Sequence, residues 1–151
     1  MGVRQGCVLS PLLFNIFMSD LPSKLCEDVN VTLDENTKLN CLLWADDIIL
    51  LSETEDGLNK LLDDLRNYSE QNHLKINTKK TKCMIFNKTG RLIHRNFYLG
   101  DRKLENVRSY KYLGLIVRGV YLPKVQFNMK DTSHKISKLI SCLLRPCNYK
   151  T

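Results

Sequence analysis

Two adjacent carboxylates, Asp46 and Asp47, stand between two apolar runs and are the residues of this sequence best suited to chemistry. An unpaired ionised carboxylate is costly to bury, and a second one beside it adds repulsion, so a cation is expected near the pair. Mg²⁺ prefers oxygen ligands and is commonly held by one or two carboxylates together with substrate phosphates. Two such ions about 3.5–4 Å apart can stabilise the attacking and leaving oxygens of a phosphoryl transfer. The alternative is that Asp-Asp makes a solvated hairpin turn.

Charge is distributed unevenly along the 151 residues. Residues 1–72 contain 5 Lys/Arg and 13 Asp/Glu, a net charge of −8, whereas residues 73–151 contain 18 Lys/Arg and 3 Asp/Glu, a net charge of +15. Such asymmetry suits a protein that holds cations with one half and nucleic-acid phosphates with the other. A solvated basic face is equally compatible with these counts.

Composition bounds the class of protein. Hydrophobic residues make up 43% of the chain and charged residues 26%, which excludes a disordered tail, a collagen-like fibre and a low-complexity linker. No apolar run reaches the roughly 18 residues of a membrane span, and no secretory signal is recognisable, so we expect no membrane association and a cytoplasmic or nuclear location. Cys41 and Cys83 lie in apolar runs and are expected to be buried, reduced thiols.

A β-hairpin is the element that must position the acidic pair. Residues 39–44 and 48–51 are predicted strands, joined by the three residues 45–47. The pattern Ser52-x-x-Glu55 then predicts a capping box that opens an amphipathic helix. Its buried face is expected to carry Leu58, Leu61, Leu62, Leu65 and Tyr68. Asn72-His73 is expected to end this helix in a left-handed turn.

The remaining elements predict an α+β fold with a mainly antiparallel sheet. Ser10 is expected to cap an N-terminal helix, with proline at its first position. Strands are predicted over 82–87 and 110–117, and a hairpin is predicted around Gly100-Asp101. A helical pattern resumes at about residue 122, and its apolar positions are Val125, Met129, Ile136, Leu139, Ile140 and Leu143, before Pro146.

Four blocks together resemble the reverse transcriptases, in that family's order and at plausible spacing. Residues 2–15 resemble the block that opens the helix beside the incoming nucleotide, and residues 44–47 resemble the x-A-D-D catalytic hairpin. Residues 74–81 are similar to the next block, with its Asn-x-x-Lys-Thr pattern, and residues 110–114 resemble the primer-grip block. The Gly-Val-Arg-Gln-Gly form and the Tyr-Leu-Gly ending are similar to non-LTR (LINE-type) retrotransposon enzymes.

The resemblance implies a fold and a set of partners. The fold would be a reverse-transcriptase palm-like antiparallel sheet with packed helices, a fragment lacking the fingers and the first palm strand. Residues 1–120 would be a partial palm, and residues 121–151 the start of the thumb or a C-terminal helical extension. The partners would be an RNA template, a DNA primer and deoxynucleotides, and the cofactor Mg²⁺, with two ions in the intact family.

The resemblance also implies a catalytic role for three residues. Asp46 would be a metal-ligating carboxylate, and Asp47 would support the second ion. Lys80 would sit near the pyrophosphate leaving group as counter-charge or general acid. Because Lys79 and Lys82 are close by in the sequence, a merely solvated Lys80 is the alternative.

Two further sets of residues acquire binding roles from the same resemblance. Gln5 and Gly6 would lie where the nucleotide approaches, since glycine allows close approach of the backbone and glutamine offers both a donor and an acceptor. Tyr112, Leu113 and Gly114 would hold the primer end. Ordinary strand packing is the alternative for these last three residues.

Departures from the family pattern limit the expected activity. Trp44 stands where the family usually has Phe or Tyr, and His73 stands where it usually has Gly. The fingers and a palm strand with a further metal-binding Asp are not recognisable in the chain. We therefore expect RNA-directed DNA polymerase descent without polymerase activity in the isolated chain. A non-catalytic nucleic-acid-binding remnant is the alternative function.

Overall fold

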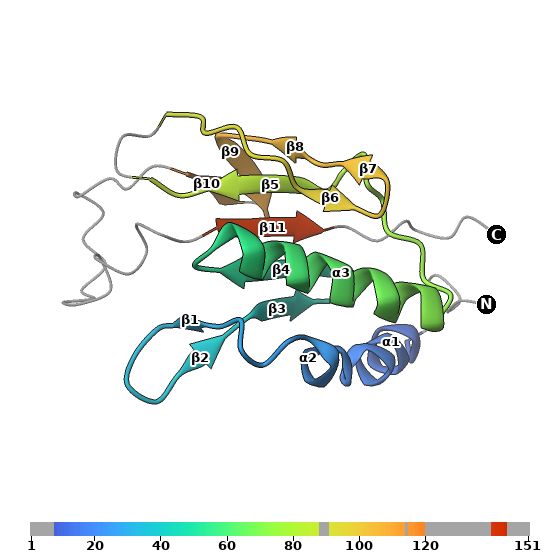
Figure 1. The fold of residues 1–151 in the computed structure, drawn as a ribbon. Helices are drawn as coiled ribbons and strands as arrows, with labels where there is room; N and C mark the ends of the chain where they lie inside the picture. The colour runs from blue at the N-terminus through green and yellow to red at the C-terminus, as the bar shows by residue number, and fades with distance from the viewer. Residues whose placement is uncertain (1–7, 88–90, 114, 120–139, 145–151) are drawn as a thin grey trace.

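A computed structural model describes residues 8–87, 91–113, 115–119 and 140–144, with the backbone alone for Leu115 and for residues 140–144. These residues form a mixed fold of helices packed on a sheet, as the order of elements predicts (Figure 1). The helices are α1 (Ser10–Met18), α2 (Leu21–Lys24) and α3 (Glu55–Gln71). Among the described residues, no helix has the length and apolar character of a membrane span.

The main sheet has five strands in the order β3-β4-β11-β5-β8. Their bounds are β3 (Cys41–Trp44), β4 (Asp47–Ser52), β5 (Lys82–Ile85), β8 (Glu105–Asn106) and β11 (Ile140–Leu144). Every pairing is antiparallel except β5 with β8.

Three two-stranded ladders surround the main sheet, and each is antiparallel. They are β1 (Val31–Thr32) with β2 (Lys38–Leu39), β6 (Tyr98–Leu99) with β7 (Arg102–Lys103), and β9 (Ser109–Tyr112) with β10 (Leu115–Arg118). The predicted hairpin at Gly100-Asp101 is therefore confirmed, and Gly100 adopts φ +59° there.

A helix was expected from about residue 122 to Pro146, and this prediction is wrong at Ile140–Leu144. These residues form β11, which pairs with β4 on one side and with β5 on the other (Figure 1). Because β4 and β5 both run antiparallel to β11, they are parallel to each other, and the α3 crossover between them leaves room for one strand. The facing edges of β4 and β5 offer unpaired backbone N–H and C=O groups on both sides of this space. Pairing with both edges favours a strand more strongly than the helical spacing of the apolar residues favours a helix. Residues 122–139 of the same prediction lie outside the described residues.

Helix α3 forms where its apolar spacing predicts, but its cap differs from the expectation. The N-cap is Thr54, whose Oγ1 accepts a hydrogen bond from the Gly57 N–H at 3.0 Å. Ser52 remains in β4, and its Oγ accepts from the Thr54 N–H. The predicted capping box at Ser52 and Glu55 is therefore wrong, because the strand extends one residue further than its apolar run suggested, to Ser52. His73 adopts φ +54° after the helix, which confirms the predicted left-handed turn.

Helix α1 begins one residue earlier than predicted. Ser10 is its first residue rather than its cap, and the preceding Leu9 provides no side-chain cap. Pro11 lies in the first turn, where its missing N–H would have had no intrahelical acceptor.

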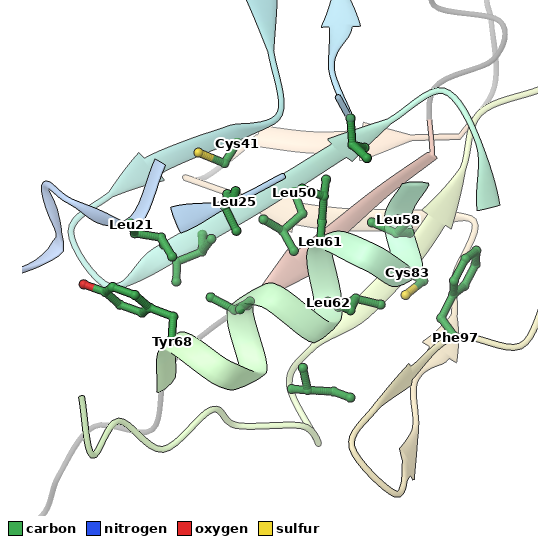
Figure 2. Packing of buried hydrophobic residues seen from close by; sticks show 14 of the residues in the cluster. Leu21, Leu25, Cys41, Leu50, Leu58, Leu61, Leu62, Tyr68, Cys83 and Phe97 are labelled. Atoms are coloured by element: carbon green, nitrogen blue, oxygen red, sulfur yellow. The ribbon is translucent and has the colours of Figure 1, made fainter. Parts of the chain in front are cut away.

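The core lies between α3 and one face of the sheet (Figure 2). Leu58, Leu61 and Leu62 of α3 are fully buried against Leu50 of β4. The free thiols Cys41 and Cys83 are also buried in this cluster, as predicted. Burial raises the pKa of the Cys41 thiol, so it stays protonated.

The opposite face of the sheet is covered by the β9–β10 hairpin. Ile49 and Met84 are buried there, and Tyr110, Tyr112 and Val117 pack against them. One continuous strand was predicted over 110–117, and this is wrong because the chain reverses at Leu113, with φ +47°. Folding back lets aromatic side chains of one segment cover a sheet face that would otherwise be exposed.

Candidate functional site

The acidic pair lies at the tip of the predicted hairpin, although the loop is one residue shorter than expected. Trp44 pairs with Asp47, so Asp47 is the first residue of β4 and only Ala45 and Asp46 form the turn. Two-residue hairpin loops need positive φ, and Ala45 adopts φ +50°. A side chain at such a φ costs of order 1 kcal/mol. The turn leaves Asp46 exposed and holds Asp47 half-buried in a strand.

Strand alternation sets the face on which Asp47 lies. Ile48 and Leu50 belong to the core cluster beneath α3, whereas Ile49 belongs to the cluster beneath the β9–β10 hairpin. Successive strand residues point to opposite faces, so Asp47 shares the face of Ile49. Directly paired residues also share a face, which places Trp44 beside Asp47, with 63% of its surface exposed.

Tyr112 and Asp47 influence each other electrostatically across this face. Burial raises the pKa of the Tyr112 phenol, and the negative charge of Asp47 raises it further. A phenol that stays neutral beside a carboxylate can serve as a hydrogen-bond donor. The structure thus brings together two residues that the sequence assigned to different blocks.

Sheet register brings Lys80 to the same end of the sheet as Asp47. Leu143 of β11 pairs with Ile49 of β4 and with Lys82 of β5, so Ile49 and Lys82 stand at one level. Asp47 and Lys80, each two residues earlier, therefore lie at the same end of the sheet. Two strand spacings separate β4 from β5, which is about 10 Å between backbones.

Asn77 holds the loop that carries Lys80. The Lys80 N–H donates to the Asn77 main-chain O at 3.0 Å, and the Asn77 Oδ1 lies 3.2 Å from the same nitrogen. Thr81, which is fully buried, donates its hydroxyl to the same main-chain O at 2.9 Å. The Lys80 side chain is exposed, as it would be in either the catalytic or the solvated interpretation.

Sequence reasoning missed two positioning residues at this site. Asn77 was noted only as part of a pattern, although Asn that bonds the backbone three residues later is ordinary turn chemistry and could have been recognised. Tyr110 places its hydroxyl 3.5 Å from the Lys80 main-chain O. No local pattern indicates that contact, because it depends on how the hairpin folds over the sheet.

The described residues gather part of the predicted site. One end of the sheet carries Asp46, Asp47 and Lys80, with Tyr112 of β9 close to Asp47. The turn of the β9–β10 hairpin follows Tyr112 and contains Leu113, which is 48% exposed. Gln5, Gly6 and Gly114 lie outside the described residues.

The donor chemistry of the acidic pair fits a hard divalent cation such as Mg²⁺. Mg²⁺ keeps several waters and needs only one or two protein carboxylates. Within the described ranges, no group of three or more His, Cys, Asp or Glu is placed to hold a metal. By themselves, Asp46 and Asp47 would therefore supply only part of the ligand set of a metal ion.

Comparison with known proteins shows which proteins this chain is similar to. Residues 1–117 match the family described as reverse transcriptase (RNA-dependent DNA polymerase). The chain is 30% identical over 156 residues to the Retrovirus-related Pol polyprotein from type-2 retrotransposable element R2DM of Drosophila melanogaster, covering 96% of this chain. It is 28% identical over 145 residues, 90% of this chain, to the type-1 R2 polyprotein of Nasonia vitripennis.

A third relative comes from another element. The chain is 34% identical over 121 residues, 76% of its length, to the probable RNA-directed DNA polymerase from transposon BS of Drosophila melanogaster. The matches cover 14% of each of the two R2 polyproteins and 13% of the BS protein. The chain thus spans a small part of these curated relatives.

Proposed function

The chain belongs to the reverse transcriptase (RNA-dependent DNA polymerase) family, and from that membership we propose that its sheet and packed helices are the palm of a non-LTR retrotransposon enzyme. The partial palm would comprise residues 1–120, with residues 121–151 beginning the thumb or a helical extension. The observation that supports this proposal is the end of the sheet at which Asp47 and Lys80 lie two strands apart, with Tyr112 within electrostatic reach of Asp47.

Asp46 and Asp47 are the residues that would hold Mg²⁺ in this palm. Both supply oxygen donors, Asp46 from an exposed turn and Asp47 from the first position of a strand. When bound, the ions, two in the intact family, would neutralise charge on the reacting phosphate. The backbone turn, fixed by the Trp44–Asp47 pairing, holds the two carboxylates before any cation arrives.

The surrounding residues would orient the two reacting groups. Lys80, held by Asn77, would present its ammonium to the pyrophosphate leaving group and donate a proton there. Tyr112, Leu113 and Gly114 would position the primer end, and Gln5 and Gly6 would contact the nucleotide. The reaction would join the primer 3′-hydroxyl to the α-phosphate of a deoxynucleotide opposite an RNA template and release pyrophosphate.

Terbium luminescence tests the cation site directly. Trp44 is the single tryptophan of the chain and pairs with Asp47, so Tb³⁺ bound by the acidic pair would be sensitised by it. We expect Tb³⁺ emission that is lost when Mg²⁺ displaces the bound Tb³⁺. The double variant Asp46→Asn, Asp47→Asn should show no such emission. The exposed pair Asp28→Asn and Asp63→Asn is the matched control. Equal emission from both double variants would refute the site.

Primer extension on an RNA template tests the activity of the isolated chain. With only two carboxylates gathered among the described residues, we propose that the 151-residue chain alone does not polymerise. Extension that disappears in Asp46→Asn would overturn this inactivity. Strand binding without cation binding at the acidic pair would instead favour the non-catalytic nucleic-acid-binding remnant.

A further inference from the structure

A basic pocket of about 480 Å³ opens next to the Lys80 loop, at the start of β5. Its lining residues are Thr78, Lys79, Lys82, Arg102, Lys103 and Glu105. They come from the loop before β5, from β5 itself, and from β7 and β8. The pocket is thus formed where the β6–β7 hairpin approaches the loop before β5, with β8 alongside.

The pocket has an excess of positive charge. Four of its lining residues are cationic and one is anionic, and that carboxylate, Glu105, forms an ion pair with Lys82. A further ion pair joins Arg95 to Glu55, outside this pocket. Lys79, Arg102 and Lys103 are exposed, and together they give the pocket a net charge of about +3.

Arg102 is held in place rather than free to move. Its Nη1 donates to the Thr78 Oγ1 at 3.2 Å, which joins the β6–β7 hairpin to the loop that carries Lys80. A guanidinium has five N–H donors in a fixed plane, so one bond to a hydroxyl leaves donors for a second acceptor. Planar presentation of several donors is the geometry by which arginine binds phosphate oxygens.

The position of the pocket relates it to the acidic pair. From β4 the sheet continues through β11 and β5 to β8, three strand spacings, or about 14 Å. Nucleic acid advances about 3.4 Å per nucleotide along its axis, so this span corresponds to roughly four nucleotides. A strand with one nucleotide at Asp46 and Asp47 therefore reaches the pocket a few nucleotides away.

We propose that this pocket binds backbone phosphates of a nucleic-acid strand, about four nucleotides from the acidic pair. The inference rests on the proposed function, which supplies a strand at the other end of the span. The ligand is a phosphodiester, recognised by charge and by the fixed guanidinium and therefore independently of sequence. Lys79, Arg102 and Lys103 carry the contact, and Glu105 weakens it by neutralising Lys82.

Fluorescence anisotropy with a labelled single-stranded oligonucleotide, in EDTA, tests the pocket separately from the cation site. The combined variant Lys79→Gln, Arg102→Gln and Lys103→Gln is expected to bind at least tenfold more weakly than the unmodified chain. Its salt dependence should also become shallower by about 2 in the log–log slope, because about 0.7 is lost per single-strand phosphate contact. Circular dichroism of each variant serves as the check that it is folded.

The matched control removes three charges elsewhere. Lys24→Gln, Lys38→Gln and Lys60→Gln change exposed lysines on α2, β2 and α3. An equal loss of affinity in this control would overturn the proposal, since net charge alone would explain binding. Because no divalent cation is present, failure of the Asp46–Asp47 site leaves this result unaffected.

Glu105→Gln tests the sign of the effect. Removing the carboxylate frees Lys82 and should tighten strand binding several-fold, whereas unchanged or weaker binding would contradict the proposal. Inorganic pyrophosphate distinguishes a free phosphate from a strand. If pyrophosphate binding requires Lys79, Arg102 and Lys103 while strand binding does not, the pocket is a site for small anions and the proposal fails.

Discussion

At the residue scale, Asp47 links the acidic turn to the hairpin that covers the sheet. Its carboxylate lies on the same sheet face as the phenol of Tyr112 and disfavours ionisation of that phenol. Burial acts in the same direction and is the larger cause. The folded chain therefore holds the Tyr112 proton more tightly than the unfolded chain does.

Replacing Asp47 with Asn should lower the pKa of Tyr112 toward its ordinary value of about 10, because the nearby negative charge is removed while burial remains. Ultraviolet absorbance of tyrosinate during a pH titration measures this, with Tyr112→Phe assigning the signal. Since the folded-state pKa is raised, the associated stability is complete below about pH 10 and declines above it. An unchanged Tyr112 titration in Asp47→Asn, matching that of the exposed control Asp63→Asn, would refute the coupling.

At the scale of elements, β11 decides whether the sheet is continuous. It fills the space between β4 and β5 and pairs with both over nearly its whole length. Without it, the edges of two apolar strands would expose unpaired backbone groups. The edge that gathers Asp47 and Lys80 therefore depends on a segment far along the chain.

Proline in the middle of β11 should destabilise the whole sheet. Cys142→Pro removes a backbone donor in a strand paired on both sides, and we expect a loss of about 2–4 kcal/mol in the free energy of unfolding. Urea denaturation followed by circular dichroism measures it. Cys142→Ala, which keeps the N–H, is the control. Equal stability of the two variants would show that residues 140–144 do not form a central strand.

At the scale of the whole molecule, apolar residues divide into a buried core and an exposed helix face. The core joins α2, α3 and the sheet, whereas α1 directs most of its apolar side chains outward. The exposed apolar residues of this region are Val8, Leu9, Leu12, Leu13, Ile16 and Phe17. Similar residue types are therefore expected to contribute very differently to stability.

Two leucine truncations make this difference measurable. Leu61→Ala removes a side chain that is 0% exposed and should cost about 2–5 kcal/mol through lost burial and a cavity. Leu13→Ala removes one that is 53% exposed and should change the free energy of unfolding by less than about 0.5 kcal/mol. Thermal or urea unfolding compares them. A cost at Leu13 as large as that at Leu61 would mean that α1 is packed against something in the isolated chain.

Local patterns in the sequence were sufficient for the elements whose formation depends on neighbouring residues. The acidic hairpin, helix α3, the left-handed turn at His73 and the turn at Gly100 all form as predicted. Buried thiols at Cys41 and Cys83 also follow from their apolar surroundings. The four blocks indicated the family that residues 1–117 match.

Tertiary structure alone decided which distant segments meet. The Ile140–Leu144 spacing suits a helix, yet two unpaired strands impose an extended conformation on it. Residues 110–117 fold back at Leu113, and this reversal buries Ile49 and Met84 of the sheet under side chains of the hairpin. The placement of Asp47 and Lys80 at one end of the sheet, and of the basic pocket beside them, follows from strand register. Register between distant strands is set by which apolar faces are buried together, and short-range sequence patterns do not show that partner.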